Sequence, residues 1–283
     1  MRPCLGLSSS RVRFRVLGSG SSGNTTLVEG GGSYVLIDAG LGPRETAERL
    51  QSLGIDPSSV AAIVLSHEHQ DHCKGAPSLS WKWGVRLAGS RGTYAAGGFG
   101  AVDIKGWDVL ELGQPRAFGG LTITAVPIPH DAAGPVAFVL SADGVTMGHA
   151  TDFGHVSRPL VDAFKACDTV VMESNYDAAM LRDGSYPWSL KERILGRLGH
   201  LSNDDVADYI VRGLGESCRT LVLAHLSRKN NHPELARMSA EHALRRRNRT
   251  EVRLEIAEPD GMDWIPVTPP PRPAKGPEQL RLF

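Results

Sequence analysis

Residues 67–72, with the sequence HEHQDH, place three histidines and two acids in six consecutive positions. Imidazole and carboxylate groups are common ligands of divalent metal ions, and so many of them cannot be buried cheaply without a partner. His67 and His69 can converge if the segment stays extended, while Asp71 and His72 can turn toward a neighbouring point at the start of a helix. The segment therefore predicts a site for two adjacent metal ions.

The segment directly follows an aliphatic run at residues 61–65, which predicts a strand covered on both faces. Further strands are expected at residues 11–18, 25–30, 34–40, 121–126, 136–140, 144–152, 169–174 and 220–224. Helices are expected at residues 43–55 and 160–167, as a pair within 189–214 interrupted near Gly199 and His200, and before residue 247. This alternation predicts an α/β fold in which polar clusters follow strand ends.

The 283 residues are expected to form one main domain, residues 1–267, followed by a proline-rich tail, residues 268–283. The formal net charge is zero, so any nucleic-acid binding must come from local patches rather than a global positive field. Four widely spaced cysteines fit neither a zinc knuckle nor a disulfide framework and favour a reducing cytoplasm. No apolar run suggests a signal peptide or a membrane span, so we expect a soluble cytoplasmic protein.

The H-x-H-x-D-H signature resembles that of the metallo-β-lactamase superfamily, which implies a four-layer αββα sandwich. The superfamily's later ligands find matches, in order, in IPHDAAGP (His130), ATDFG (Asp152) and LVLAHLS (His225), and the resemblance spans residues 12–257. It implies that one ion is held by His67, His69 and His130, the other by Asp71, His72 and His225, with Asp152 between them.

Within the superfamily the sequence is similar to the YycJ/WalJ group, through GSGSSGN, HEHQDHCKG, IPHDAAGPVAF, ATDFG, ESN, GHLSN and AHLSRKNN. This resemblance implies a phosphodiesterase that uses two divalent ions, Zn or Mn, and acts as a DNA exonuclease from the 5′ end. It also implies catalytic parts for Asp71 and Asp152. We assign His200, in GHLS, to proton donation or phosphate stabilisation rather than to a metal.

Five other functions are considered as alternatives to this one. The ESN, GHLS and HLSRKNN elements are also similar in order to the EAT, HST and HFSSRY elements of ribonuclease Z, which would make RNA the substrate. A thioester hydrolase like glyoxalase II would be expected to carry an additional C-terminal helical domain, and a β-lactamase would be exported. A β-CASP nuclease needs a large insertion between Asp152 and His225, where the chain leaves no room. A metal-binding regulator without turnover would not need the complete ligand set.

Several other residues near these motifs are not expected to bind metal. His149 and His155 flank Asp152 but do not match ligand positions, and Cys73 is expected to start a buried helix as a small apolar residue. Asn24, in the GSGSSGN loop, could supply an amide beside the site. The basic run Arg245, Arg246, Arg247 and Arg249 is expected to complement a helix dipole rather than to follow a nucleic-acid backbone.

The last five residues of the tail read QLRLF, after six prolines from Pro266 to Pro277. A proline-rich segment is a semi-rigid spacer that does not pack a core. The pentapeptide resembles the motif with which bacterial replication and repair proteins dock on the sliding clamp. The resemblance predicts clamp binding through Gln279, Leu280, Leu282 and Phe283, against the alternatives that the tail folds back on its own domain or is idle.

Overall fold

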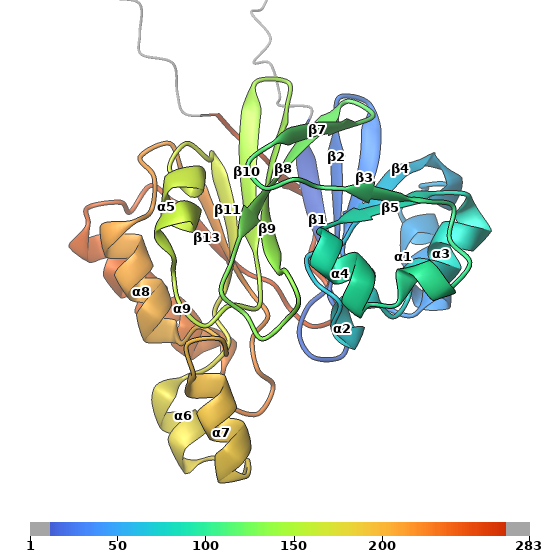
Figure 1. Ribbon diagram of the computed structural model, residues 1–283. Coiled ribbons are helices and arrows are strands. Elements are labelled where there is room, and N and C mark those ends of the chain that lie inside the picture. Colours follow the sequence, from blue (N-terminus) through green and yellow to red (C-terminus); the bar gives the residue numbers. More distant parts are fainter. Residues whose placement is uncertain (1–11, 270–283) are drawn as a thin grey trace, which may run out of the picture.

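A computed structural model describes residues 12–269 as two seven-stranded β-sheets packed face to face, with helices on each outer side (Figure 1). This architecture is the four-layer αββα sandwich, so the expected fold class is confirmed. The first sheet has the strand order β14 (Ile265–Pro266), β1 (Arg13–Gly18), β2 (Thr25–Gly30), β3 (Ser33–Ile37), β4 (Val60–Val64), β5 (Arg86–Gly89) and β6 (Trp107–Val109).

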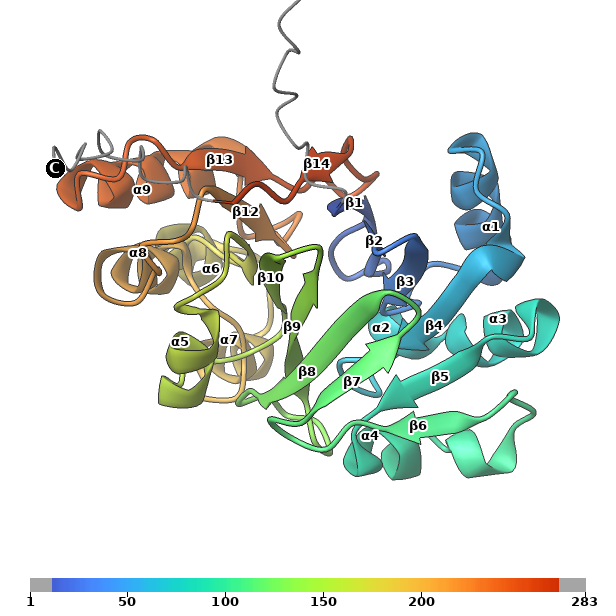
Figure 2. The same cartoon turned by 90° about the horizontal axis from the view of Figure 1, so that it is seen from above.

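The second sheet comes from the later part of the chain. Its strand order is β13 (Arg253–Ile256), β12 (Thr220–Ala224), β11 (Thr169–Glu173), β10 (Val145–Ala150), β9 (Val136–Ala142), β8 (Leu121–Pro127) and β7 (Pro115–Phe118). The last strand, β14, leaves this half and pairs antiparallel with β1, so the chain returns to the first sheet at its end (Figure 2).

Helices cover the outer face of each sheet. The first sheet is covered by α1 (Pro43–Ser52), α2 (Gln70–Cys73), α3 (Ala76–Trp83) and α4 (Arg91–Ala96), with short 3₁₀ helices η1 (Pro57–Ser59) and η2 (Phe99–Ala101). The second sheet is covered by α5 (Arg158–Phe164), α8 (Asn203–Arg212) and α9 (Pro233–Arg246). The pair α6 (Ala178–Asp183) and α7 (Trp188–Leu195) projects from the body; we call residues 176–198 the arm (Figure 1).

The four layers follow from where the apolar side chains lie. Phe14, Phe138 and Val222 belong to a buried cluster between the two sheets, whereas Leu50 and Phe164 belong to clusters beneath the helices on either side. Every residue of β11 and of β12 is buried, as expected for parallel strands covered on both faces. Burial of one such large apolar side chain stabilises a fold by about 1.5–3 kcal/mol.

The parallel strands determine where polar side chains meet. β3, β4, β5 and β6 run parallel to one another, as do β10, β11, β12 and β13. The carboxyl ends of parallel strands lie at one edge of a sheet, and in open α/β sheets ligands bind outside that edge. In this fold the two such edges face each other, which brings together loops that are far apart in the sequence.

The expected strands and helices are present, with boundaries shifted by a few residues, but several elements were not expected. These are β5, β6, β7, β13 and β14 together with α3, α4 and α6, which are mostly short. The expectation for Cys73 is wrong, because Cys73 ends the four-residue helix α2 instead of starting a helix. Its buried thiol donates to the Glu68 carbonyl at 3.0 Å, and burial raises the pKa of Cys73 to about 11.

The strand β14 and the buried side chain of Val267 are the last packed parts of residues 12–269. A domain boundary at residue 267 stays a prediction, because residues 270–283, including the QLRLF segment at 279–283, lie outside the described part of the chain. Across residues 12–269, none of the helices combines the length and hydropathy that crossing a lipid bilayer requires.

Candidate metal centre

Seven His and Asp side chains converge where the two sheets face each other. Their ligand atoms form overlapping groups, each with all its atoms within 4.8 Å of one another. Four of the residues follow β4 in the first sheet, and three follow β8, β10 and β12 in the second. The seven are the residues that the sequence singled out: His67, His69, Asp71, His72, His130, Asp152 and His225. How they divide between two ions stays a proposal.

His67, His69 and His130 form one group. The Nε2 atom of His130 lies 3.3 Å from Nδ1 of His69, and His130 Nδ1 donates to the Leu198 carbonyl at 3.0 Å. His67 directs Nδ1 to the Ser66 hydroxyl at 3.0 Å, while its buried Nε2 has no hydrogen-bond partner within residues 12–269. Each of these two rings therefore uses one nitrogen to fix its orientation and leaves the other for the centre of the group.

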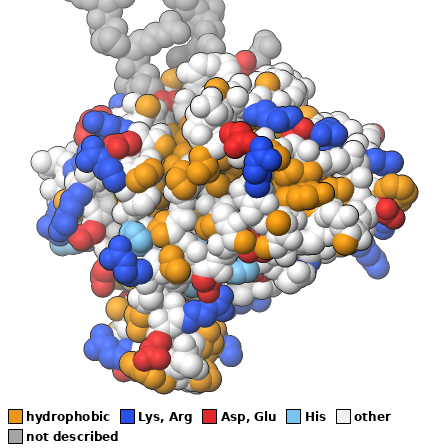
Figure 3. Space-filling view, in the orientation of Figure 1, with side chains coloured by type: hydrophobic (Ala, Val, Ile, Leu, Met, Phe, Trp, Pro, Cys, Tyr) orange, Lys and Arg blue, Asp and Glu red, His pale blue; other side chains and the backbone are white. Residues whose placement is uncertain are grey.

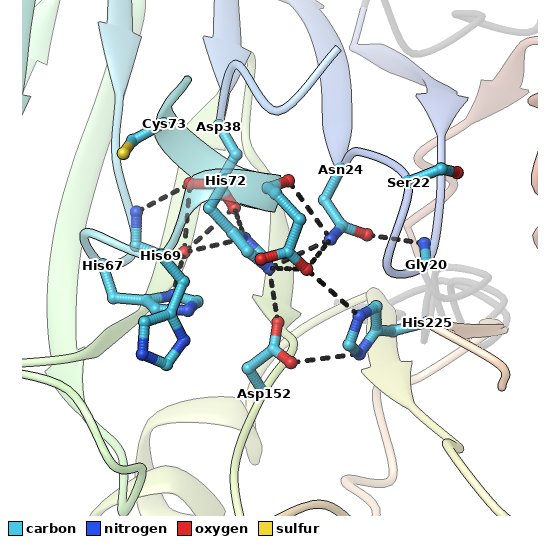
Figure 4. Close-up of polar contacts among 12 residues, drawn as sticks. Gly20, Ser22, Asn24, Asp38, His67, His69, His72, Cys73, Asp152 and His225 are labelled. Carbon is cyan, nitrogen blue, oxygen red and sulfur yellow. Dashed lines mark hydrogen bonds and ion pairs between the residues drawn. The ribbon is translucent and has the colours of Figure 1, made fainter. Parts of the chain in front are cut away.

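Asp71, His72 and His225 form a second group, and Asp152 lies between the two (Figure 4). One carboxylate oxygen of Asp152, Oδ2, lies 2.6 Å from His72 Nε2, and the other, Oδ1, lies 3.1 Å from His225 Nδ1. His225 Nε2 is 3.9 Å from Asp71 Oδ2 and has no hydrogen-bond partner among residues 12–269. Asp152 also shares a group with His67 and His72, so its carboxylate lies close to members of both groups.

The backbone is held in the left-handed region at three residues around this centre. Asp38, Asp152 and His225 have φ angles of 60°, 60° and 56°, and each follows the end of a strand. Residues other than glycine seldom adopt this conformation, and where they do it costs about 1–3 kcal/mol. The surrounding structure therefore forces these side chains inward at the expense of local backbone stability.

Burial and neighbouring charges oppose each other across the cluster. Burial lowers the pKa of His67 well below its usual value, and the neighbouring His72 lowers it further. Burial also disfavours the charged form of His72, but the Asp152 and Asp38 carboxylates outweigh this and raise the pKa of His72 well above its usual value. In the same way His225 and His72 overcome burial and hold the pKa of Asp152 well below the usual range.

The donor set fits divalent metal ions. The Nε2 atoms of His67 and His225 are buried and have no hydrogen-bond partner in the described part of the chain, which is costly unless a ligand completes them. Imidazole nitrogens with carboxylate oxygens suit Zn or Mn, and groups of three such ligands leave positions open for a substrate. Each group combines residues that follow strands of both sheets, so each ion would be held from both sides of the sandwich.

Two buried carboxylates that do not belong to the seven clustered residues orient the histidines. They were not identified from the sequence. Asp38 Oδ2 lies 2.8 Å from His72 Nδ1, and its Oδ1 accepts from the Ser66 backbone amide at 2.8 Å. Glu173 Oε1 lies 2.7 Å from His225 Nδ1 and 2.8 Å from His200 Nδ1. Each acid directly follows or ends a strand of the central layers, and that shared position is the signal that could have identified them.

We expect Asp38→Asn to lower metal affinity about 10- to 100-fold, because the carboxylate fixes the orientation and basicity of His72. A competition titration of the metal against a chromophoric chelator measures this. Asp168→Asn is the matched control, since Asp168 is also buried but accepts from the Thr146 amide away from the cluster. Equal metal affinities in the Asp38 variant and the wild type would contradict the role of Asp38 in orienting His72.

The GSGSSGN loop holds the ligand helix α2 in place. The Asn24 backbone amide donates to the Asp71 carbonyl at 2.7 Å, and the Asn24 side-chain amide lies 3.0 Å from His72 Nε2. A Cβ atom on Gly40 would lie 1.6 Å from the Asp71 carbonyl oxygen, so only glycine allows the β3 loop to pack against α2. Asn24 thus lies beside the site, as the sequence suggested, and contacts protein ligands there.

His200 lies at the edge of the cluster, where it lines a hollow of about 260 Å³. Its Nδ1 faces Glu173 Oε1 at 2.8 Å and Asp152 Oδ1 at 3.2 Å. Although burial disfavours its charged form, these carboxylates raise the pKa of His200 to about 11. We call this space the central hollow; it is shared by the metal-centre residues and by Tyr186, Leu190, Arg193 and Ile194 of the arm.

The remaining candidates lie outside the cluster. His155 Nδ1 donates to the Arg197 carbonyl at 3.0 Å, and His149 contacts Thr26. Arg245 and Arg246 are exposed in the last turn of α9, where they complement the helix dipole. In contrast, Arg247 donates to the Ile210 carbonyl at 2.7 Å and Arg249, which is buried, donates to the Cys218 carbonyl at 2.7 Å, so these two connect structural elements.

We expect the buried His149 to make the protein less stable at acidic pH. Burial lowers its pKa to about 4, whereas an unfolded histidine has a value near 6.5. As the pH falls below 6.5, this histidine therefore takes up a proton in the unfolded chain but not yet in the folded protein. Its contribution to the free energy of unfolding is fully present above pH 6.5 and falls by about 3 kcal/mol as the pH drops to 4. Urea unfolding with chelator present, at pH values from 7 to 4, should show a shallower decline for His149→Gln. Identical declines in the two proteins would disprove this account.

Comparison with known proteins agrees with the fold. The family model described as the beta-lactamase superfamily domain matches residues 33–226. The chain is 35% identical to exodeoxyribonuclease WalJ of Streptococcus pneumoniae over 242 residues, 84% of this chain and 90% of that protein. It is 34% identical to exodeoxyribonuclease YycJ of Bacillus anthracis over 235 residues, 82% of this chain and 89% of that protein.

Among solved structures, the metallo-β-lactamase fold protein YhfI of Bacillus subtilis superposes with a TM-score of 0.68. The match covers 89% of this chain and 99% of YhfI at 17% sequence identity, so it concerns the fold alone. The sequence relatives, the family match and the ligand cluster agree with one another. The chain belongs to the β-lactamase superfamily, together with its WalJ and YycJ relatives.

Proposed function

We propose that this protein is a metal-dependent DNA exonuclease that acts from the 5′ end. The proposal rests on one combined observation, a convergent cluster of seven His and Asp ligands in a chain 35% identical to an exodeoxyribonuclease over most of its length. A cytoplasmic location, Zn or Mn as the native ion, and DNA rather than RNA as the substrate belong to the same proposal.

The protein's own groups have separate tasks in this reaction. Two divalent ions bound by the cluster would supply Lewis acidity and lower the pKa of water. Asp152, held between His72 and His225, would fix the spacing of the two ion sites, with Asp38 and Glu173 orienting the histidines. His200 directs Nδ1 to Glu173, so its Nε2 is the nitrogen free to give a proton to the departing oxygen.

The test is a cleavage assay on end-labelled substrates. Protein loaded with Mn or Zn is incubated with single- and double-stranded DNA and RNA, and product lengths are scored from each end. A ladder that starts at the 5′ end of DNA is the expected result. Cleavage of RNA alone would instead favour a ribonuclease Z-like activity, and no cleavage of any substrate by metal-loaded protein would refute a nuclease.

We also propose that the QLRLF segment, residues 279–283, binds the bacterial sliding clamp. It lies outside the described residues, so its support is the resemblance of the five residues and the nuclease proposal itself. Tethering to a clamp would raise the effective concentration of a protein with zero net charge at DNA. The peptide GPEQLRLF should bind the clamp of the same organism in a titration. Equal binding by a Gln279→Ala, Phe283→Ala peptide, or no binding at hundreds of micromolar, would exclude this.

A further inference from the structure

A second hollow opens beside the central hollow. It has a volume of about 280 Å³ and is lined by Ser21, Ser22, Tyr186, Ser227, Arg228 and Lys229. Ser21, Tyr186 and Ser227 line both spaces, so the second one, which we call the side hollow, begins where the metal centre ends. A chain-like substrate that has one phosphodiester at the metal centre can therefore extend directly into the side hollow.

Two uncompensated cations lie in the side hollow. Arg228 and Lys229 are exposed, and among residues 12–269 no carboxylate lies within 4 Å of either charged group. Arg193, which lines the central hollow, differs because its guanidinium pairs with Asp131 at 2.6 Å. Unpaired cations only three and four residues after the ligand His225 give an anion-binding character to the side hollow.

The loop that carries these cations is held firmly. The Ser227 amide donates to the Asn175 carbonyl at 2.8 Å, and the Asn231 amide donates to the Ser227 carbonyl at 3.1 Å. The arm is connected to the same loop, because the Asp177 amide donates to the Asn230 carbonyl at 2.8 Å. The cations and the arm are therefore positioned together before any substrate binds, which lowers the entropy cost of binding.

Tyr186 contributes an aromatic ring at the junction of the two hollows. It is half-buried, packs against the small apolar cluster of the arm that contains Tyr176, Leu181 and Ile194, and faces the Lys229 ammonium at 5.4 Å. Figure 3 shows basic, acidic and hydrophobic side chains interspersed on the arm. Aromatic rings beside basic groups are the elements with which proteins bind single-stranded nucleic acid, by stacking bases and pairing phosphates.

The geometry points to a nucleotide subsite in the side hollow. Arg228 and Lys229 bind the phosphate next to the scissile one, and the base of that nucleotide stacks on Tyr186. This inference rests on the proposed nuclease function and specifies which part of the site recognises the neighbouring nucleotide. It makes an unpaired strand the preferred substrate, because a base that stacks on Tyr186 cannot remain stacked in a duplex.

The test compares two substrates that differ in whether they reach the side hollow. Bis(p-nitrophenyl) phosphate reports on the metal centre alone, and a single-stranded oligodeoxynucleotide reports on both hollows. The Arg228→Ala, Lys229→Ala double variant should raise the KM for the oligonucleotide at least about tenfold and lower the slope of log KM against log salt by about 1.4. Its kcat on the small diester should equal that of the wild type.

Two matched control variants test whether the effects come from the charges of the side hollow and from the ring of Tyr186. Arg245→Ala, Arg246→Ala removes the same charge from exposed positions on α9 and should leave the KM and the salt slope unchanged. Tyr186→Leu should raise the oligonucleotide KM by roughly tenfold, while Tyr186→Phe keeps the ring and should behave as wild type.

The outcomes distinguish the subsite from the nuclease proposal. The subsite would be overturned if the Arg228, Lys229 double variant kept the wild-type KM and salt slope on the oligonucleotide. It would also be overturned if that variant lost activity equally on both substrates. A wild type that hydrolyses neither substrate with metal bound would refute the nuclease function instead.

Discussion

Asp152→Asn is expected to lower phosphodiester hydrolysis by about 10³-fold or more while the protein stays folded. Asp152 contacts two residues of the second group, His72 at 2.6 Å and His225 at 3.1 Å, and its carboxylate also clusters with His67 of the first group. Loss of its charge removes several kcal/mol of stabilisation of the reacting charges, and each 1.36 kcal/mol corresponds to tenfold in rate. Asparagine keeps the shape of the side chain and tolerates the φ angle of 60° better than alanine would.

Turnover, bound metal per protein and the unfolding midpoint should be measured together on this variant. Asp143→Asn is the matched control, because Asp143 also has a positive φ angle, 50°, but lies in the β9–β10 turn. His69→Ala is expected to abolish hydrolysis as well, since His69 belongs to the His67 and His130 group. Wild-type turnover with wild-type metal content, in either site variant, would show that the ligands are assigned wrongly.

His200→Ala is expected to keep both metal ions and to lower kcat by about 10²- to 10⁴-fold, the usual contribution of a positioned proton donor. The histidine lines the central hollow and is oriented through Nδ1 by Glu173, and its Nε2 makes no hydrogen bond within residues 12–269. Its neighbours in space include Asp152 and His225, so a part in metal binding is the alternative that the experiment must separate.

Measuring the bound metal together with single-turnover rates distinguishes a proton donor from a metal ligand. His155→Ala is the control, because His155 is bonded to the Arg197 carbonyl outside the cluster, and its loss should change neither quantity. Metal loss in the His200 variant would make this residue a ligand. Full turnover with full metal content would remove it from the mechanism altogether.

The sequence was informative where chemistry and local patterns coincided. The dense polar segment at residues 67–72 follows an aliphatic strand, and the ordered resemblance led to His130, Asp152 and His225, which converge in space. The αββα layers followed from the same ordered set, because a shared ligand order implies a shared fold. Strands such as β11 and β12, which have aliphatic residues at their centres, were also recognisable from residue type alone.

Other features depend on contacts between distant segments, which no local pattern records. Asp38 and Glu173 are single acids at strand ends, and only the fold shows that they lie within 2.8 Å of histidine rings. The short strands β6 and β14 are determined by their pairing partners β5 and β1 rather than by their own composition. Cys73 was misplaced because α2 ends after one turn, where Gly75 donates to the Ala39 carbonyl.

Each proposed ion site would take its ligands from both sheets, and this would link metal supply to the lifetime of the protein. Metal ions bound there would cross-link two halves of the chain that are otherwise joined mainly by apolar contact. At a free metal concentration a thousand times the dissociation constant, such binding stabilises the folded state by about 4 kcal/mol per site. Because marginally stable proteins are continuously removed by proteases, metal starvation would reduce the amount of this protein in the cell as well as its activity.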